Sequence, residues 1–177
     1  ISLNNLGMSH LLLGDLTRAR GYFEQSIIIR KEIGDQRGEA TSVNNVGMVF
    51  SRSGEFRKAV EYLQQGLDLR REIGERAGEA ISLRNLGTTY YLSGDISRAA
   101  DYLTLANNLG RELGDRRVES DSHYWLAIID RDRGEIDRAI VNIESGLRII
   151  EQIRGELVNP ELRTAYFSTV QDYYELY

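Results

Sequence analysis

The chain has 177 residues, a net charge of −5 and no cysteine, and 41% of its residues are hydrophobic. Without cysteine it has no thiol nucleophile, disulfide or cysteine-ligated metal, and its acidic balance argues against nonspecific binding to nucleic acid or anionic membranes. No apolar run approaches the roughly 20 residues that span a bilayer. Because the chain opens with Ile1 and has no signal-peptide pattern, we expect a cytoplasmic fragment of a longer protein.

One short phrase returns every 40 residues. SLNNLG near the start becomes SVNNVG, then SLRNLG, and finally SHYWLA. Two columns of this repeat never change: Gly14, Gly54, Gly94 and Gly134, and Ala19, Ala59, Ala99 and Ala139. The pattern predicts repeats at 1–40, 41–80, 81–120 and 121–153, followed by a C-terminal capping or linker helix at 154–177.

Each repeat predicts two helices. In the first repeat, Leu3, Leu6, His10 and Leu13 recur at helical spacing, and Gly14 ends this first helix. The apolar face of the second helix is predicted at Leu16, Ala19, Phe23, Ile27 and Ile29. Asp15 is a predicted N-cap for the second helix, and Asp35, which follows the helix-ending Gly34, for the first helix of the next repeat.

The small residues Gly7 and Ala19 indicate a close helix crossing in each hairpin, because a larger side chain would push the two axes apart. A single hairpin cannot cover its own apolar faces, so several must stack to bury a continuous core. The sequence therefore predicts an all-α fold of stacked antiparallel helix hairpins.

This pattern resembles the tetratricopeptide repeat (TPR). The small residue after a leucine in the first helix, the early alanine of the second, and the bulky residue four positions later match that family over residues 1–153. The resemblance implies a right-handed superhelical solenoid of about four repeats plus a C-terminal helix. The usual unit has 34 residues, and six more add roughly 9 Å of helix. The 40-residue form is similar to repeats of kinesin light chains, spindle-orientation adaptors and bacterial signalling proteins.

In that family the first helices line a concave groove, which implies binding positions at columns 1, 4, 5, 8, 11 and 12 of each repeat. Asparagine offers both donors and an acceptor, so a row of asparagines suits the backbone of an extended peptide. The predicted peptide-binding residues are Asn4, Asn5, Asn44, Asn45, Arg52, Arg84, Asn85, Tyr91, Tyr124 and Arg131. An acidic peptide with an aromatic or aliphatic anchor fits this set.

Structural roles compete with these assignments. The asparagines could instead bond neighbouring helices and fix their register, and Trp125 fits a core or capping position. His10 shares a column with Phe50 and Tyr90, which indicates packing between helices, and His123 belongs to no recognised metal motif. No phosphate-binding loop, dinucleotide motif or nucleophile elbow is present. We therefore expect no enzyme activity, no cofactor and no bound metal.

The register breaks after Ile153. Asn159 and Pro160 predict a helix start, and the stripe Leu162, Ala165, Tyr166, Thr169, Val170, Tyr173 and Leu176 predicts a helix that covers the open end of the stack. The residues Asn159 to Arg163, Tyr166–Phe167 and Val170 to Tyr174 also resemble the segment that precedes a caspase-like CHAT domain in bacterial proteins.

Two functions fit this sequence. The first is a non-catalytic scaffold that recognises an extended or helical protein segment in its groove, as the recognition module of a larger signalling protein. The alternative is a regulatory or self-associating arm that controls a downstream CHAT-type protease domain absent from this chain. In both, the partner is a protein or peptide, not nucleic acid or a membrane.

Overall fold

The computed structural model describes residues 2–157 and 170–176. The chain divides into two compact units, Ile1–Ala99 and Ala100–Tyr177, and each is considered by itself. The described residues are helical, with no strand among them. None of the described helices is long and apolar enough to cross a membrane.

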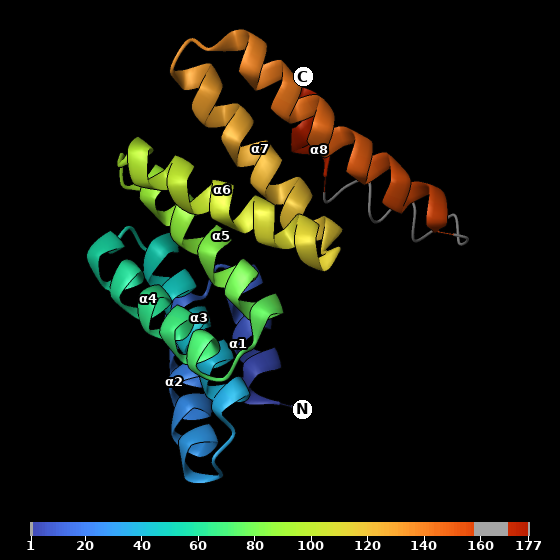
Figure 1. The fold of residues 1–177 in the computed structure, drawn as a ribbon. Coiled ribbons are helices and arrows are strands. Elements are labelled where there is room, and N and C mark those ends of the chain that lie inside the picture. The colour runs from blue at the N-terminus through green and yellow to red at the C-terminus, as the bar shows by residue number, and fades with distance from the viewer. Residues whose placement is uncertain (1, 158–169, 177) are drawn as a thin grey trace. The chain divides into compact units, whose positions relative to one another are not determined.

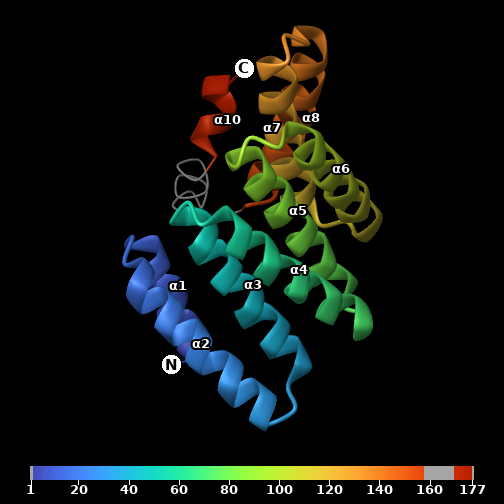
Figure 2. The same ribbon diagram turned by 90° about the vertical axis from the view of Figure 1, so that its left-hand side faces the viewer.

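The first unit consists of consecutive antiparallel helices joined by short turns (Figure 1). Neighbours along the chain pack against one another from α1 to α5, and α3 also contacts α5 and α1. Figure 2 shows α1 to α4 side by side in chain order. The helices are α1 (Leu3–Leu12), α2 (Leu16–Glu32), α3 (Gln36–Arg52), α4 (Phe56–Glu72), α5 (Arg76–Leu92) and the start of α6 (Ile96–Leu113).

The second unit contains the rest of α6, α7 (Arg116–Asp132), α8 (Ile136–Glu156) and the short helix α10 (Gln171–Leu176). α7 and α8 form a hairpin, and α10 packs against α8. Most of the predicted C-terminal stripe lies outside the described residues, including Leu162, Ala165, Tyr166 and Thr169, and so do Asn159 and Pro160.

The predicted helix ends are confirmed at both turns of the first repeat. Gly14 has φ of +78° and Gly34 has φ of +70°, a left-handed conformation that glycine adopts without a steric penalty. Asp15 Oδ1 accepts a hydrogen bond from the Arg18 N–H at 3.1 Å, and Asp35 Oδ1 accepts one from the Gly38 N–H at 2.9 Å. Both aspartates are therefore the N-caps that the sequence predicts.

The close helix crossings are also confirmed. A Cβ atom added to Gly47 would lie 2.7 Å from Cγ of Leu63 on the partner helix, and one added to Gly7 would lie 2.7 Å from Cδ1 of Phe23. The side chains of Ala19 and Ala59 are fully buried. These positions are small because the facing helix already occupies the space that a larger side chain would need.

The core of the first unit differs from the predicted stripes at two residues. Leu13 is 80% exposed and Ile29 is 45% exposed, so the assignment of both to the apolar faces was wrong. Leu13 follows the last residue of α1, where the chain turns toward Gly14, and Leu11 is the buried leucine of this helix end. The buried cluster is Leu11, Ala19, Phe23, Val46, Val49, Phe50 and Ala59.

The last turn of α4 holds a buried arginine that contacts the start of α5. Arg70 is 4% exposed, its guanidinium donates to the carbonyl of Gly78, and its Nε lies 3.7 Å from Oε2 of Glu75. Burial lowers the pKa of Arg70, and the charge of Glu75 opposes that effect. In the third repeat the equivalent positions are Gly110 and Val118, so glycine and the larger residue have exchanged places.

Candidate functional site

The predicted asparagine columns form a ladder of side-chain hydrogen bonds across the first helices of the repeats. Asn45 Nδ2 on α3 donates to Asn4 Oδ1 on α1 at 3.1 Å. Asn85 Nδ2 on α5 donates to Asn44 Oδ1 on α3 at 3.2 Å. The structure therefore brings four of the predicted residues together in pairs that join neighbouring repeats.

The ladder satisfies much of its own hydrogen-bonding capacity. Asn44 Oδ1 also accepts from the hydroxyl of Ser82 at 3.3 Å, and Arg84 Nη2 donates to Asn85 Oδ1 at 3.1 Å. Asn44, Asn45 and Asn85 are 2%, 6% and 8% exposed. A ligand can reach these three amides only by replacing bonds that already exist, whereas the neighbouring Asn5 is exposed.

The remaining predicted residues of the first unit, apart from Asn5, lie on α3 and α5. Arg52, near the end of α3, is exposed and donates from Nη1 to the carbonyl oxygen of Leu11 at 2.9 Å. Leu11 is the residue before the last one of α1, so Arg52 places a cation at the negative end of that helix dipole. Tyr91 and Arg84 on α5 are half-buried. Amide groups thus recur along α1, α3 and α5, with one arginine each on α3 and α5 and a tyrosine on α5.

The predicted residues of the second unit have different surroundings. The ring of Tyr124 stacks on Tyr173 of α10, with centroids 4.5 Å apart, and burial together with the charge of Asp172 raises the pKa of the Tyr124 hydroxyl. Trp125 is half-buried and meets Tyr124 edge-on at 5.7 Å. Arg131 is exposed and pairs with Asp132 at 3.0 Å.

The sequence analysis did not identify a column of buried serines. Ser42, Ser82 and Ser122 hold the second position of their repeats and are fully buried. The hydroxyl of Ser42 donates to that of Ser26 on α2 at 2.9 Å, and the hydroxyl of Ser82 donates to Asn44. The invariant serine that opens the repeated phrase was the signal, because an unvarying hydroxyl on an otherwise apolar face indicates a buried hydrogen bond.

The sequence analysis also missed a partly buried chain of polar side chains in the second unit. His123 Nδ1 lies 3.0 Å from Oδ1 of Asn142, whose Nδ2 donates to Asp130 at 2.8 Å. Asp130 is 2% exposed, and Arg138 reaches it at 3.7 Å. Asp130 takes the column of Phe50 and Tyr90, so a carboxylate stands where earlier repeats have an aromatic ring. The change from aromatic to acid in that column was the available signal.

The histidines are engaged in packing and polar contacts. His10 is half-buried and stacks on Tyr22 with ring centroids 5.3 Å apart, as its column predicts. Among the described residues, no group of three or more His, Asp or Glu side chains is placed to hold a metal ion. These contacts give both histidines a structural role.

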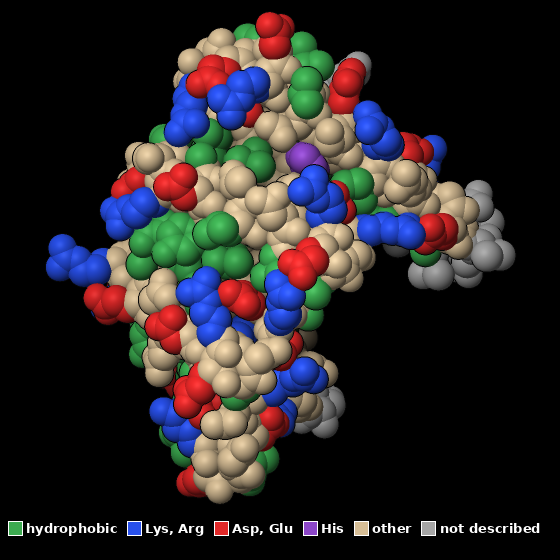
Figure 3. All heavy atoms as spheres, viewed as in Figure 1, with side chains coloured by type: hydrophobic (Ala, Val, Ile, Leu, Met, Phe, Trp, Pro, Cys, Tyr) green, Lys and Arg blue, Asp and Glu red, His purple; other side chains and the backbone are tan. Residues whose placement is uncertain are grey.

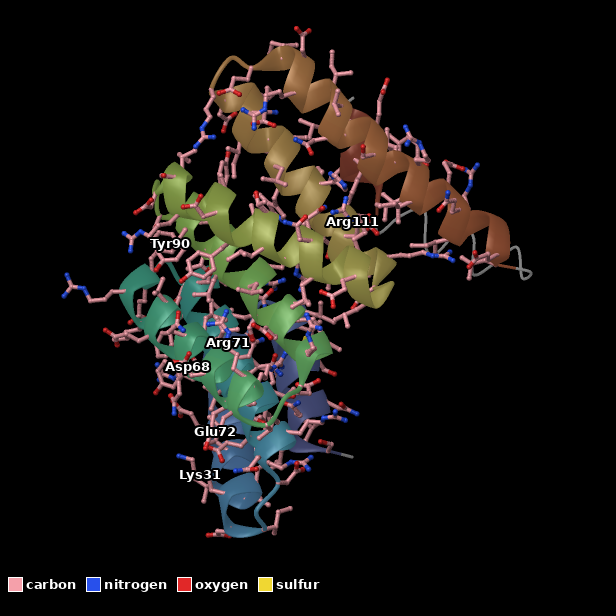
Figure 4. The ribbon with its side chains drawn as sticks, in the orientation of Figure 1. Lys31, Asp68, Arg71, Glu72, Tyr90 and Arg111 are labelled. Carbon is pink, nitrogen blue, oxygen red and sulfur yellow. The ribbon has the colours of Figure 1, made fainter. Side chains whose placement is uncertain are left out.

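The second helices carry charges of both signs. Lys31 on α2 pairs with Glu39 at 3.5 Å, and Arg71 on α4 pairs with Glu79 at 2.7 Å. Both cations, together with Asp68 and Glu72, are labelled in Figure 4. Figure 3 shows blue and red side chains interleaved over the α4 side of the first unit. This surface lacks the single sign of charge that would attract a polyanion.

Comparisons with known proteins show what this chain is similar to. The family model described as "Tetratricopeptide repeat" matches residues 1–72. This part of the chain is similar to the tetratricopeptide repeat family. Solved structures of the same helical fold, one of them described as TPR-like repeats, align along almost the whole chain. The search of curated proteins found no match.

Three solved structures illustrate the likeness of fold. A Rap protein complexed with Competence and Sporulation Factor aligns with a TM-score of 0.80, 16% identity, and coverage of 98% of this chain and 53% of its own. BtubC (BKLC) from P. vanneervenii aligns with a TM-score of 0.74 and 23% identity. The alignment covers 89% of this chain and 65% of BtubC. The TPR-like repeats of a putative kinesin light chain from Podosopora anserina align with a TM-score of 0.68 and 16% identity. The alignment covers 99% of this chain and 90% of that structure. The chain thus spans 53–65% of the length of the first two.

Proposed function

We propose that this TPR chain is a non-catalytic scaffold that recognises an extended or helical protein segment along its first helices, as the recognition module of a larger signalling protein. The observation that carries the proposal is the amide ladder. Asn4, Asn45, Asn44 and Asn85 tie α1, α3 and α5 at one register. Equivalent side chains of successive repeats therefore line up along α1, α3 and α5. A linear ligand that contacts each repeat in turn needs such a row of side chains.

Exposure supports some of the predicted residues as the first contacts of the ligand. Asn5 and Arg52 are exposed, and Asn4, Arg84 and Tyr91 are half-buried, so these five are the accessible part of the predicted set in the first unit. Asn44, Asn45 and Asn85 hold the layer together and contact a peptide only where the ladder opens. Arg52 and Arg84 favour an acidic ligand, because guanidinium groups form charge-assisted hydrogen bonds with carboxylates.

Similarity of fold supports a peptide as the ligand. The aligned Rap structure is a complex with Competence and Sporulation Factor. We propose that this chain likewise binds a peptide. We also propose that it does so in the cytoplasm of a bacterium. In the second unit, taken by itself, the predicted ligand-binding residues are Tyr124 and Arg131.

Peptide-display selection on the full chain tests the proposal. Selected peptides are expected to be acidic, and Arg84→Ala is expected to weaken their binding in calorimetry. Removing a hydrogen bond to a charged group costs about 1.5–3 kcal/mol, or roughly ten- to a hundredfold in Kd. The matched control is Arg57→Ala, an exposed arginine on α4. Peptides that bind both variants equally, or a selection that yields no binder, would contradict peptide recognition along this layer.

The second candidate is a regulatory arm for a downstream CHAT-type protease domain. It is supported by the tail resemblance and by α10, whose Tyr173 contacts Asp121 and Tyr124 on α7. Such a contact would couple the repeats to a domain attached beyond the tail. Reading the native gene beyond Tyr177 tests it, and a continuation without a caspase-like His and Cys pair would contradict it.

A further inference from the structure

The helix α10 covers an apolar face of the α7–α8 hairpin. Tyr173 is 6% exposed and Val170, just before α10, is 8% exposed. Both join one buried cluster with Ala127 of α7 and Ile143 and Ile150 of α8. Figure 2 shows α10 beside α7. Without α10, this cluster would lose its outer layer to solvent.

Directional bonds fix α10 in place. The hydroxyl of Tyr173 donates to Oδ1 of Asp121 at 2.7 Å while its ring stacks on Tyr124, and the hydroxyl of Tyr174 hydrogen-bonds to Glu151. The opposite side of α10 is exposed, and there Gln171 bonds only along the helix, to Glu175 at 2.8 Å. The α7–α8 face is therefore complementary to one side of a tyrosine-bearing helix. We call it the α10 face and define it by Asp121, Tyr124, Ala127, Ile143, Ile150 and Glu151.

The α10 face corresponds to a surface that joins repeats elsewhere in the chain. In the first unit, Asn44, in the column of Tyr124, is contacted by Ser82 and Asn85 of the next first helix. Ser26, in the column of Gly146, is likewise contacted by Ser42 of the next first helix. In the second unit, Tyr173 stacks on Tyr124, and its Cε1 would lie 3.5 Å from a Cβ added to Gly146. α10 therefore takes the place of a following repeat.

α10 is much smaller than the helices it replaces. It has 6 residues, whereas α3, α5 and α7 have 17 each. Isolated helices shorter than about 12 residues are marginal in water, so α10 depends on its face for stability.

We infer that the α10 face is an exchangeable docking surface whose second occupant is α10 of another copy of this chain. The partner is a second copy because α10 is the segment whose tyrosines and apolar residues match the face bond by bond. A linked segment has an effective concentration on the order of millimolar, so the closed monomer dominates at lower chain concentrations. When a chain's own α10 is lost or displaced from its face, α10 of another copy binds there and joins the two copies. This association does not depend on any ligand on α1, α3 and α5.

Complementation between two full-length variants tests this inference. Tyr173→Ala removes the tail contact and leaves the face intact, whereas the double change Asp121→Ala, Tyr124→Ala disables the face and leaves the tail intact. Each variant alone is expected to sediment as a monomer. Their mixture is expected to form a 1:1 heterodimer of twice the mass, because one variant offers a free face and the other a free tail.

The control replaces Tyr173→Ala with Glu175→Ala, a change on the exposed side of α10. Its own tail keeps the face occupied, so mixing it with the face variant is expected to give monomers. A mixture of Tyr173→Ala and the face variant that stays monomeric while both show full helical circular dichroism overturns the inference. A dimer of Tyr173→Ala by itself would also overturn it, because association would then use another surface.

A second measurement covers the case in which the face variant fails to fold. A fluorescent peptide of residues 165–177 is titrated into the wild type and into Tyr173→Ala. The peptide is expected to bind the Tyr173→Ala chain more tightly, since the wild-type face is filled in cis. Equal or undetectable binding to both chains overturns the inference.

Discussion

Asn85 and Asn44 share a side-chain hydrogen bond of 3.2 Å, although 41 residues separate them in sequence. The bond joins the fifth column of one repeat to the fourth column of the repeat before it, and Asn45 and Asn4 repeat the same relation at 3.1 Å. The Asn85–Asn44 bond is buried and the Asn45–Asn4 bond is partly buried. Away from water an amide hydrogen bond is stronger and an unpaired amide is more costly. The two asparagines of the phrase therefore have different partners, one in the preceding repeat and one in the following repeat.

Replacing Asn44 by alanine should destabilise the first unit. The change leaves the Asn85 amide and the Ser82 hydroxyl without their shared acceptor in a buried place. Each buried group that loses its partner costs about 1–3 kcal/mol. Urea denaturation followed by circular dichroism measures the loss. Asn5→Ala, on the exposed neighbour, is the control and should stay within about 0.5 kcal/mol of the wild type, and an equal loss in both would show that the ladder adds little.

Glycine-to-alanine changes should have opposite signs at two helical positions. Gly47→Ala would place a methyl group 2.7 Å from Cγ of Leu63 and 3.1 Å from its backbone nitrogen, so the hairpin must open, at about 1–3 kcal/mol. Gly21, inside α2, has nothing within 4 Å of an added Cβ. Gly21→Ala should therefore stabilise the chain by about 0.5–1 kcal/mol. The melting temperatures of the two variants decide this, and a shift of both in the same direction would contradict it.

The large and small residues at positions 70 and 78 are reversed in the third repeat. The effects of changing Arg70 and Gly78 on stability should therefore not be additive. Gly78→Val should clash with the Arg70 guanidinium, since an added Cβ would lie 2.7 Å from Cζ. The third repeat has the combination Gly110 and Val118, in which a Cβ on Gly110 would approach Val118 Cγ1 to 3.2 Å. The double variant Arg70→Gly, Gly78→Val should lose less stability than the sum of the single changes, by about 0.5–3 kcal/mol. Denaturation of all four chains measures this coupling, and simple additivity would refute it.

Acid should weaken the N-cap of α3. The Gly38 N–H bonded to Asp35 lowers the pKa of that carboxyl, and Arg30 lowers it further. An unfolded aspartate has a pKa of about 3.9. The folded value is lower, so the contribution of Asp35 to stability is present above that pH and is lost as the pH falls through the folded value.

Asp35→Asn tests this linkage, because asparagine also caps helices but carries no charge. Between about pH 5 and pH 2, the melting temperature of the wild type should fall more steeply than that of Asp35→Asn. The control is Asp101→Asn, which removes an exposed charge on α6. Curves for wild type and Asp35→Asn that stay parallel would show that the cap contributes no acid sensitivity.

The helices could be predicted from the sequence because their signals are local. Gly14 and Asp15 end one helix and begin the next through contacts within five residues, which a single 40-residue repeat contains in full. Side-chain direction at helix ends was less predictable. Leu13 kept the helical spacing of the stripe, yet it lies past the last residue of α1 and is exposed.

The site was harder to predict because its contacts join repeats. The sequence indicated the asparagine columns and left open whether they bond a ligand or one another. The answer for Asn44 depends on the position of Asn85, which the spacing alone does not give. The contact between Tyr173 and Asp121 was even harder to predict. Tyr173 lies beyond the last repeat and has no counterpart in the periodic columns.

The offset of the ladder bears on how such a chain could lengthen. Each bond spans one period plus one residue, so its donor and acceptor occupy fixed columns of a 40-residue unit. A tandem duplication of 40 consecutive residues that includes Asn44 copies an asparagine in each of the two columns. The new copy would then inherit a matching junction on each side without further mutation.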